Sequence, residues 1–328
     1  MKNINYQIVN LRAIAIILVV LGHSMMLYAN WGIFSPAEDF PILAFLKNKI
    51  INPFQLSLFF AVSGWLYAKT NFNKPKLSFR DFCNNKIKRL LIPYFVVALF
   101  YMNPIKFVLK IPNFENIQNL LISIFKQVIF TGSAPGHLWF LPCLFFIFII
   151  AYISFNTINS KLKKLIAFII LIILNRLSSY LPSLFMINSV LYYLIYFYLG
   201  YFIYEIQKND SIKNIVKKHK VLSTTVLFIF IMFAIIIPSY YKIVFIILSI
   251  ILLFFVIPNK KNSLLNYISI NSFGIYLFHS PFIYITFKYL TNYNPIIVIS
   301  INFIMFGCLS ILITELIRKT KYKFIIGE

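Results

Sequence analysis

Three of the four histidines lie within or at the ends of long apolar runs, where an ionisable side chain is costly. His23 lies in the run 8–28, His137 opens the run 137–155, and His279 lies in the run 271–290, whereas His219 stands among lysines in a loop. Histidine is the side chain whose ordinary pKa suits general acid–base chemistry near neutral pH. No carboxylate lies in these runs to orient metal-bound imidazoles. The pattern therefore favours proton transfer, and we expect no metal.

Arg12 and His23 share the first apolar run. At 3.6 residues per turn they are about three turns, or roughly 16 Å, apart on one helix face. Ionisable residues inside a membrane span are functional candidates by default. The alternative is that Arg12 extends to lipid phosphates while His23 packs within the helix bundle.

Two further sites follow along the chain. Ser63 precedes Gly64 in an apolar run, where it is a candidate hydrogen-bond donor to a substrate; the alternative is that the pair only permits close helix packing. Lys86 and Arg89 are three residues apart, so that they share a helix face and can bind phosphates of a nucleotide. The alternative is ordinary positive anchoring at the membrane surface.

The composition requires a bilayer around these sites. The chain has 328 residues, of which 60% are hydrophobic and only 12% are charged. This excludes soluble enzymes, disordered proteins and small secreted disulfide proteins. We predict an all-α polytopic membrane protein of about ten spans, centred on residues 8–28, 51–69, 90–109, 137–155, 165–181, 187–206, 221–237, 243–257, 271–290 and 296–317. Residues 119–130 are too short to span and are expected to be re-entrant, interfacial or packed inside.

The positions of the basic residues behind the net charge of +23 indicate the membrane topology. Most of the 31 Lys and Arg residues fall in alternate loops between the predicted spans, which by the positive-inside rule places both termini in the cytoplasm. No exposed basic domain is present, so we expect no nucleic-acid partner. The three cysteines are scattered and indicate neither disulfides nor a zinc site.

Four motifs in this order resemble the membrane-bound acyltransferase 3 family, which includes glycan, fucose and peptidoglycan O-acetyltransferases. The resemblance covers most of the chain. It rests on the Arg-x10-His pattern of Arg12 and His23, the Phe-Phe-x-x-Ser-Gly element at 59–64, the His-x-Trp-Phe-Leu element at 137–141, and the Tyr-x-x-His-x-Pro element at 276–281.

The resemblance implies transfer of an acetyl group from cytoplasmic acetyl-CoA, the acyl donor, to a hydroxyl of a cell-surface or lipid-linked carbohydrate. The implied catalytic residues are His23, as general base or acylated relay, with Arg12 and His279. The implied CoA-binding residues are Arg12, Lys86 and Arg89. The implied acceptor-binding residues are Ser63, His137, Trp139 and Tyr276.

Two positions depart from the family pattern. Lys86 replaces the first arginine of an Arg-x-x-Arg element, and Gln55 stands before Leu56 where fucose-acetylase-like relatives often have a His-Met-Pro run. We expect residues 1–328 to form one acyltransferase-3-like membrane domain without a fused extracytoplasmic esterase-like domain.

The sequence leaves several alternatives open. A transporter or flippase for a glycolipid or anionic substrate would also place Arg12 and histidines along a pathway. A succinyl or other acyl transferase of the same architecture differs only in the donor. A separate extracytoplasmic partner and a homodimer are compatible with the sequence. Membrane lipids are expected neighbours. Richness in Ile, Lys, Asn and Phe suggests an AT-rich bacterial genome, and the expected location is the bacterial cytoplasmic membrane.

Overall fold

The computed structural model describes residues 4–29, 34, 36, 39–73, 75, 77–131, 136–158, 160–209, 214–215 and 218–328. Within these ranges all regular secondary structure is helical and no strand is present, which confirms the all-α prediction. Some lysines that entered the topology prediction lie outside the described residues, namely Lys2, Lys74, Lys76, Lys213 and Lys217.

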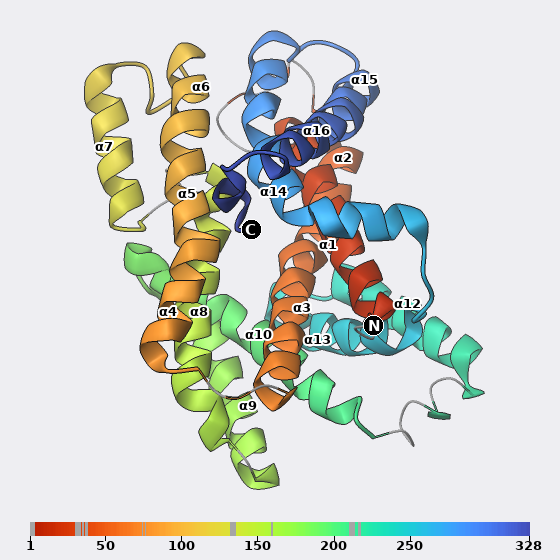
Figure 1. The fold of residues 1–328 in the computed structure, drawn as a ribbon. Helices are drawn as coiled ribbons and strands as arrows, with labels where there is room; N and C mark the ends of the chain where they lie inside the picture. The colour runs from red at the N-terminus through yellow and green to blue at the C-terminus, as the bar shows by residue number, and fades with distance from the viewer. Residues whose placement is uncertain are drawn as a thin grey trace. The chain divides into compact units, whose positions relative to one another are not determined.

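Helices cover each of the ten stretches predicted to span the membrane (Figure 1). In chain order they are α1 (Tyr6–Ser24), α2 (Pro41–Phe45), η2 (Leu46–Ile51), α3 (Asn52–Asn73), α4 (Phe79–Lys86), η3 (Ile87–Leu91), α5 (Ile92–Val97), η4 (Ala98–Met102), α6 (Asn103–Val108), α7 (Ile117–Val128), η5 (Gly136–Trp139), α8 (Phe140–Ser154), α9 (Lys161–Leu177), α10 (Ile187–Ile206), α12 (Lys220–Ile236), α13 (Ser239–Val256), α14 (Ser263–Tyr289), α15 (Pro295–Ser300), η9 (Ile301–Met305) and α16 (Phe306–Arg318).

Six helical stretches of the described chain are long and apolar enough to cross a bilayer. They are Tyr6–Ser24, Pro41–Asn73, Phe79–Val108, Gly136–Ser154, Leu184–Ile206 and Pro295–Arg318. α12 and α13 supply shorter apolar helices. α9 begins with three lysines within four residues, and α14 carries several polar residues, which lower their mean hydropathy. The count of ten spans and the cytoplasmic location of both termini therefore stay predictions.

The chain divides into two compact units. The first unit comprises Met1–Ala29, Phe40–Pro75 and Tyr196–Ser272, and the second comprises Asn30–Asp39, Lys76–Ile195 and Phe273–Glu328. Two of the boundaries between the units fall inside helices, after Ile195 in α10 and after Ser272 in α14.

In the first unit, α1 packs along α3, and α12 packs against α13. These last two form a tight hairpin, because α12 ends at Ile236 and Pro238 is the N-cap residue of α13. A buried amide network joins several of these helices. Gln207 accepts a hydrogen bond from Trp65 Nε1 (2.8 Å) and donates to Gln7 Oε1 (3.1 Å) and to the Phe254 carbonyl (2.7 Å).

The second unit contains a continuous helix, Phe79–Val108, built from α4, α5 and α6 (Figure 1). Two wide π-helical turns interrupt its α-helical geometry, at Ile87–Leu91 and Ala98–Met102. Each contains the carbonyl four residues before a proline, Pro93 or Pro104. Because proline lacks an N–H and its ring clashes with that carbonyl, a wide turn lets the helix continue without a break.

α7, which covers most of the short stretch predicted at 119–130, lies beside this long helix (Figure 1). Two of its polar side chains, Ser123 and Gln127, are buried. Gln127 and Asn103 exchange two amide hydrogen bonds, of 2.9 and 3.1 Å, and Tyr94 donates to the Gln127 carbonyl (3.0 Å). The outer face of α7 is exposed and mostly apolar. α7 is therefore packed against the unit by its polar face.

Candidate active site

The predicted site residues are divided between the two units. The first unit holds Arg12, His23 and Ser63, and the second holds Lys86, Arg89, His137, Trp139, Tyr276 and His279.

α1 carries Arg12 and His23 on one face. The helix runs without a break from Tyr6 to Ser24, and the Asn5 side chain accepts from the Ile8 N–H (3.3 Å) at its start. Uninterrupted helical geometry puts Arg12 and His23 within about 20° of each other around the axis and roughly 16 Å apart along it. Both side chains are partly buried. A cation and an imidazole are thus held at two levels of one helix.

The direction of α3 relative to α1 shows which residues of α3 lie at the height of His23 and which lie at the height of Arg12. Near the end of α1, a Cβ on Gly22 would lie 2.5 Å from Gln55 Oε1. Near its start, Gln7 is linked through Gln207 to Trp65. The two helices are therefore antiparallel, with Gln55 at the level of His23. Eight residues further along α3, about 12 Å, Ser63 lies nearer the level of Arg12.

In the Ser-Gly pair of α3, the serine hydroxyl is hydrogen-bonded within its own helix and the glycine lies at a close contact with another helix. Ser63 Oγ donates to the Phe59 carbonyl of its own helix (2.9 Å). A Cβ on Gly64 would lie 1.9 Å from the Phe197 carbonyl oxygen of α10, and a Cβ on Gly200 would lie 1.8 Å from the Ala61 carbonyl oxygen. Close packing, the alternative considered for this pair, therefore accounts for Gly64, and a substrate contact of Ser63 stays a prediction.

In the second unit, two of the predicted histidines lie together. The ring centroids of His137 and His279 are 5.2 Å apart, and Tyr276 lies 5.2 Å from His137. All three side chains are buried. The Tyr276 hydroxyl donates to the His137 carbonyl, which fixes the 3₁₀ turn η5 against α14. Tyr276 thus serves as a positioning residue for His137.

The hydrogen bonding of His279 defines its tautomer. Nδ1 lies 2.7 Å from the Ile275 carbonyl, one turn earlier in α14. Because a carbonyl oxygen only accepts, Nδ1 carries the proton and the Nε2 atom of the neutral ring carries the lone pair. A neutral imidazole of this tautomer can accept a proton at Nε2.

The remaining predicted residues differ in their surroundings. Trp139 is partly buried and lies against the Tyr193 ring at 5.6 Å. The Lys86 ammonium lies 3.4 Å from the centroid of the Phe148 ring. Arg89 is exposed. The structure therefore assigns Lys86 a cation–π contact and leaves the Arg89 guanidinium on the surface.

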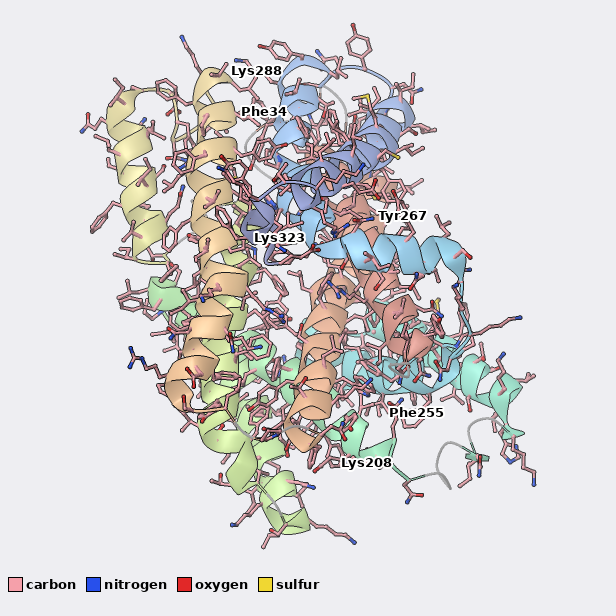
Figure 2. All side chains as sticks on the ribbon, in the orientation of Figure 1. Phe34, Lys208, Phe255, Tyr267, Lys288 and Lys323 are labelled. Carbon is pink, nitrogen blue, oxygen red and sulfur yellow. The ribbon has the colours of Figure 1, made fainter. Side chains whose placement is uncertain are left out.

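Several polar residues near these sites were missed by the sequence analysis. Lys106 is buried, with its ammonium 4.8 Å from the Phe114 ring and 5.0 Å from the Tyr284 ring. Lys288, labelled in Figure 2, donates to the Leu109 carbonyl (2.6 Å) and so ties the end of α14 to the residue after α6. Lys106 could have been selected from the sequence, because it is the one lysine within the apolar run 90–109.

Comparison with known proteins gives one finding. The family model described as an acyltransferase domain matches residues 5–315, which is nearly the whole chain. Neither the curated proteins nor the solved structures contain a match.

Proposed function

The chain belongs to the acyltransferase 3 family, as its motifs predicted, and we propose that it moves an acetyl group from cytoplasmic acetyl-CoA to a hydroxyl of a cell-surface or lipid-linked carbohydrate. Membership of the family makes it a membrane acyltransferase. The donor, the acceptor and the residue roles are our proposal. The observation that carries it is the pairing of Arg12 and His23 on one face of the unbroken helix α1.

In the proposed reaction, the acceptor hydroxyl oxygen attacks the thioester carbon of acetyl-CoA. A C–O bond forms, the C–S bond breaks, and the hydroxyl proton passes to His23. The imidazolium then gives that proton to the departing thiolate, so the products are an acetyl ester and free CoA. A positioned general base contributes roughly 10² to 10⁴-fold to such a step, because a sugar hydroxyl is a poor nucleophile at neutral pH.

Arg12 has the second role. Its guanidinium lies about three turns from His23, toward the start of α1. A planar cation of this kind binds phosphate in a bidentate manner or orients the thioester. Arg89, exposed on the second unit, is the further candidate for the CoA phosphates. Lys86 is a weaker candidate, because its ammonium already contacts an aromatic ring.

The imidazole pair of the second unit is an independent candidate for proton transfer. His279 holds its Nε2 lone pair beside the His137 ring, and Tyr276 fixes the His137 backbone. In the proposal this pair positions the acceptor or stabilises the oxyanion of the tetrahedral intermediate.

The test measures acyl transfer directly. Purified protein in liposomes is given radiolabelled acetyl-CoA, with and without a lipid and glycan extract, and released CoA is quantified. We expect extract-dependent release that falls at least about 100-fold in His23→Ala. Arg12→Lys should lower activity by at least about tenfold, because lysine cannot reproduce a bidentate contact.

His219→Ala is the matched control. It also removes an imidazole, but from an exposed position outside the proposed site. Label retained on the wild-type protein without extract would indicate an acylated relay in place of a simple base. Full activity of His23→Ala would refute His23 as the base and move that role to the imidazole pair. If the folded wild-type protein neither releases CoA nor binds acetyl-CoA, the proposed acetyl transfer is refuted. That result would favour the transporter alternative.

A further inference from the structure

A row of side-chain amides follows one face of η2 and α3 in the first unit. Gln55 Nε2 donates to Asn52 Oδ1 (2.9 Å), and Asn52 Nδ2 donates to Asn48 Oδ1 (3.1 Å). The Lys47 ammonium also donates to Asn48 Oδ1 (3.5 Å). Spacings of three and four residues put the three amides on one helix face. The row leads from the exposed Asn48 to the partly buried Gln55.

The row ends in an acceptor atom that faces α1. Gln55 Oε1 is buried, and no described part of the chain donates a hydrogen bond to it. It lies so close to Gly22 that a Cβ there would be only 2.5 Å away, and the Ile51 side chain would be 3.1 Å from the same Cβ. Glycine at position 22 therefore makes room for this amide.

A buried amide oxygen of this kind requires an explanation. Buried polar atoms in proteins are nearly always hydrogen-bonded, and a functional role is one of the established explanations for an exception. The donor end of the Gln55 amide is used by Asn52, so its orientation is fixed by the row. The amide oxygen, Gln55 Oε1, is left as an unused acceptor, and it lies beside Gly22, the residue before His23.

We propose that Gln55 Oε1 accepts a hydrogen bond from a hydroxyl of the acceptor carbohydrate, which makes Gln55 a specificity residue for the acceptor. The proposal rests on the proposed function, because it assigns a hydroxyl neighbouring the one that is acetylated. An amide oxygen accepts a hydrogen bond from a hydroxyl and disfavours an ionised carboxylate or phosphate, which has no proton to donate, at the same place. A sugar hydroxyl meets this requirement.

The position of the contact gives it this role. His23 follows Gly22 directly in α1, so a hydroxyl held at Gln55 is close in depth to the imidazole. A polyol acceptor carries hydroxyls on adjacent carbons. Holding one of them orients its neighbour toward the base, which is a positioning contribution to catalysis.

The test compares Gln55→Leu with the wild type in the CoA-release assay. Gln55→Leu keeps the size of the side chain and removes the acceptor oxygen. We expect the apparent KM for the lipid and glycan extract to rise about tenfold, the effect of one lost hydrogen bond, while the KM for acetyl-CoA is unchanged. Gln118→Leu is the matched control, because Gln118 is exposed on α7.

Thermal stability separates a functional role from a structural one. If Gln55 Oε1 is the contact for the acceptor, Gln55→Leu removes an unsatisfied buried oxygen, which offsets the loss of the hydrogen bond that Gln55 Nε2 donates to Asn52, and the Tm of the acceptor-free protein stays about equal. An unchanged KM for the extract, or a lower Tm with both KM values altered, would overturn the proposal. Inactive wild-type protein would instead refute the proposed function, so the two failures are distinguishable.

Discussion

Replacing Gly64 by alanine probes the contact between α3 and α10. An added Cβ would lie 1.9 Å from the Phe197 carbonyl oxygen, and the reciprocal Cβ at Gly200 would lie 1.8 Å from the Ala61 carbonyl oxygen. Both clashes are with backbone, which cannot rotate away as the end of a flexible side chain can. The two helices must therefore move apart to accommodate either methyl group.

The magnitude follows from the size of the required movement. Ordinary van der Waals contact begins at 3.4 Å, so the helices must separate by about 1.5 Å. Overpacking at such a rigid contact costs about 3 kcal/mol or more. Alanine in a helix interior recovers about 1 kcal/mol relative to glycine. The net loss in the free energy of unfolding is about 2 kcal/mol or more, at least a 20-fold change in the folding equilibrium.

The assay is reversible unfolding in mixed detergent and SDS micelles, followed by tryptophan fluorescence. Gly307→Ala is the matched control, because nothing lies within 4 Å of a Cβ at that position in α16. We expect Gly307→Ala to be neutral or slightly stabilising. Stability of Gly64→Ala within about 0.5 kcal/mol of this control would refute the reasoning.

Two further substitutions test the hydrogen bonds of the two units. Tyr276→Phe removes the hydrogen bond to the His137 carbonyl, so we expect kcat to fall several-fold with the KM for acetyl-CoA unchanged; a wild-type kcat would show that positioning His137 is unimportant. Gln207→Leu leaves Trp65 Nε1 and the Phe254 carbonyl buried without their partner, so we expect a loss of about 2 kcal/mol or more in detergent unfolding. Unfolding of Gln207→Leu at the wild-type SDS concentration would show that these hydrogen bonds are replaced by others.

The helices could be predicted from the sequence because each apolar run is long and its ends are marked by charged or proline residues. Such patterns do not fix how far a helix continues. Pro93 and Pro104 suggest breaks between Phe79 and Val108, yet wide turns absorb both prolines and the helix continues. Similarly, α14 begins at Ser263, eight residues before the predicted start, because a polar first section remains helical.

The site was predictable only in part, for a different reason. His137 and His279 could be selected as costly residues in apolar runs, and they lie together in the second unit. Gln55 was noted only as a departure from the family pattern. Its importance depends on the neighbouring Gly22 of another helix, a contact far apart in sequence. Likewise, the partners of Gln207 lie on other helices, which periodicity within one helix cannot reveal.

The inverted polarity of α7 has a consequence for the order in which the protein is assembled during synthesis. Gln127 finds its partners on the long helix Phe79–Val108, which leaves the ribosome first. Until that helix is in the bilayer, lipid offers no partner for the amide, and insertion of α7 alone is opposed. A helix of 12 residues, about 18 Å, also cannot anchor itself by spanning the hydrocarbon layer. We therefore expect α7 to take its place only after the long helix is complete, with that helix as the surface against which it packs.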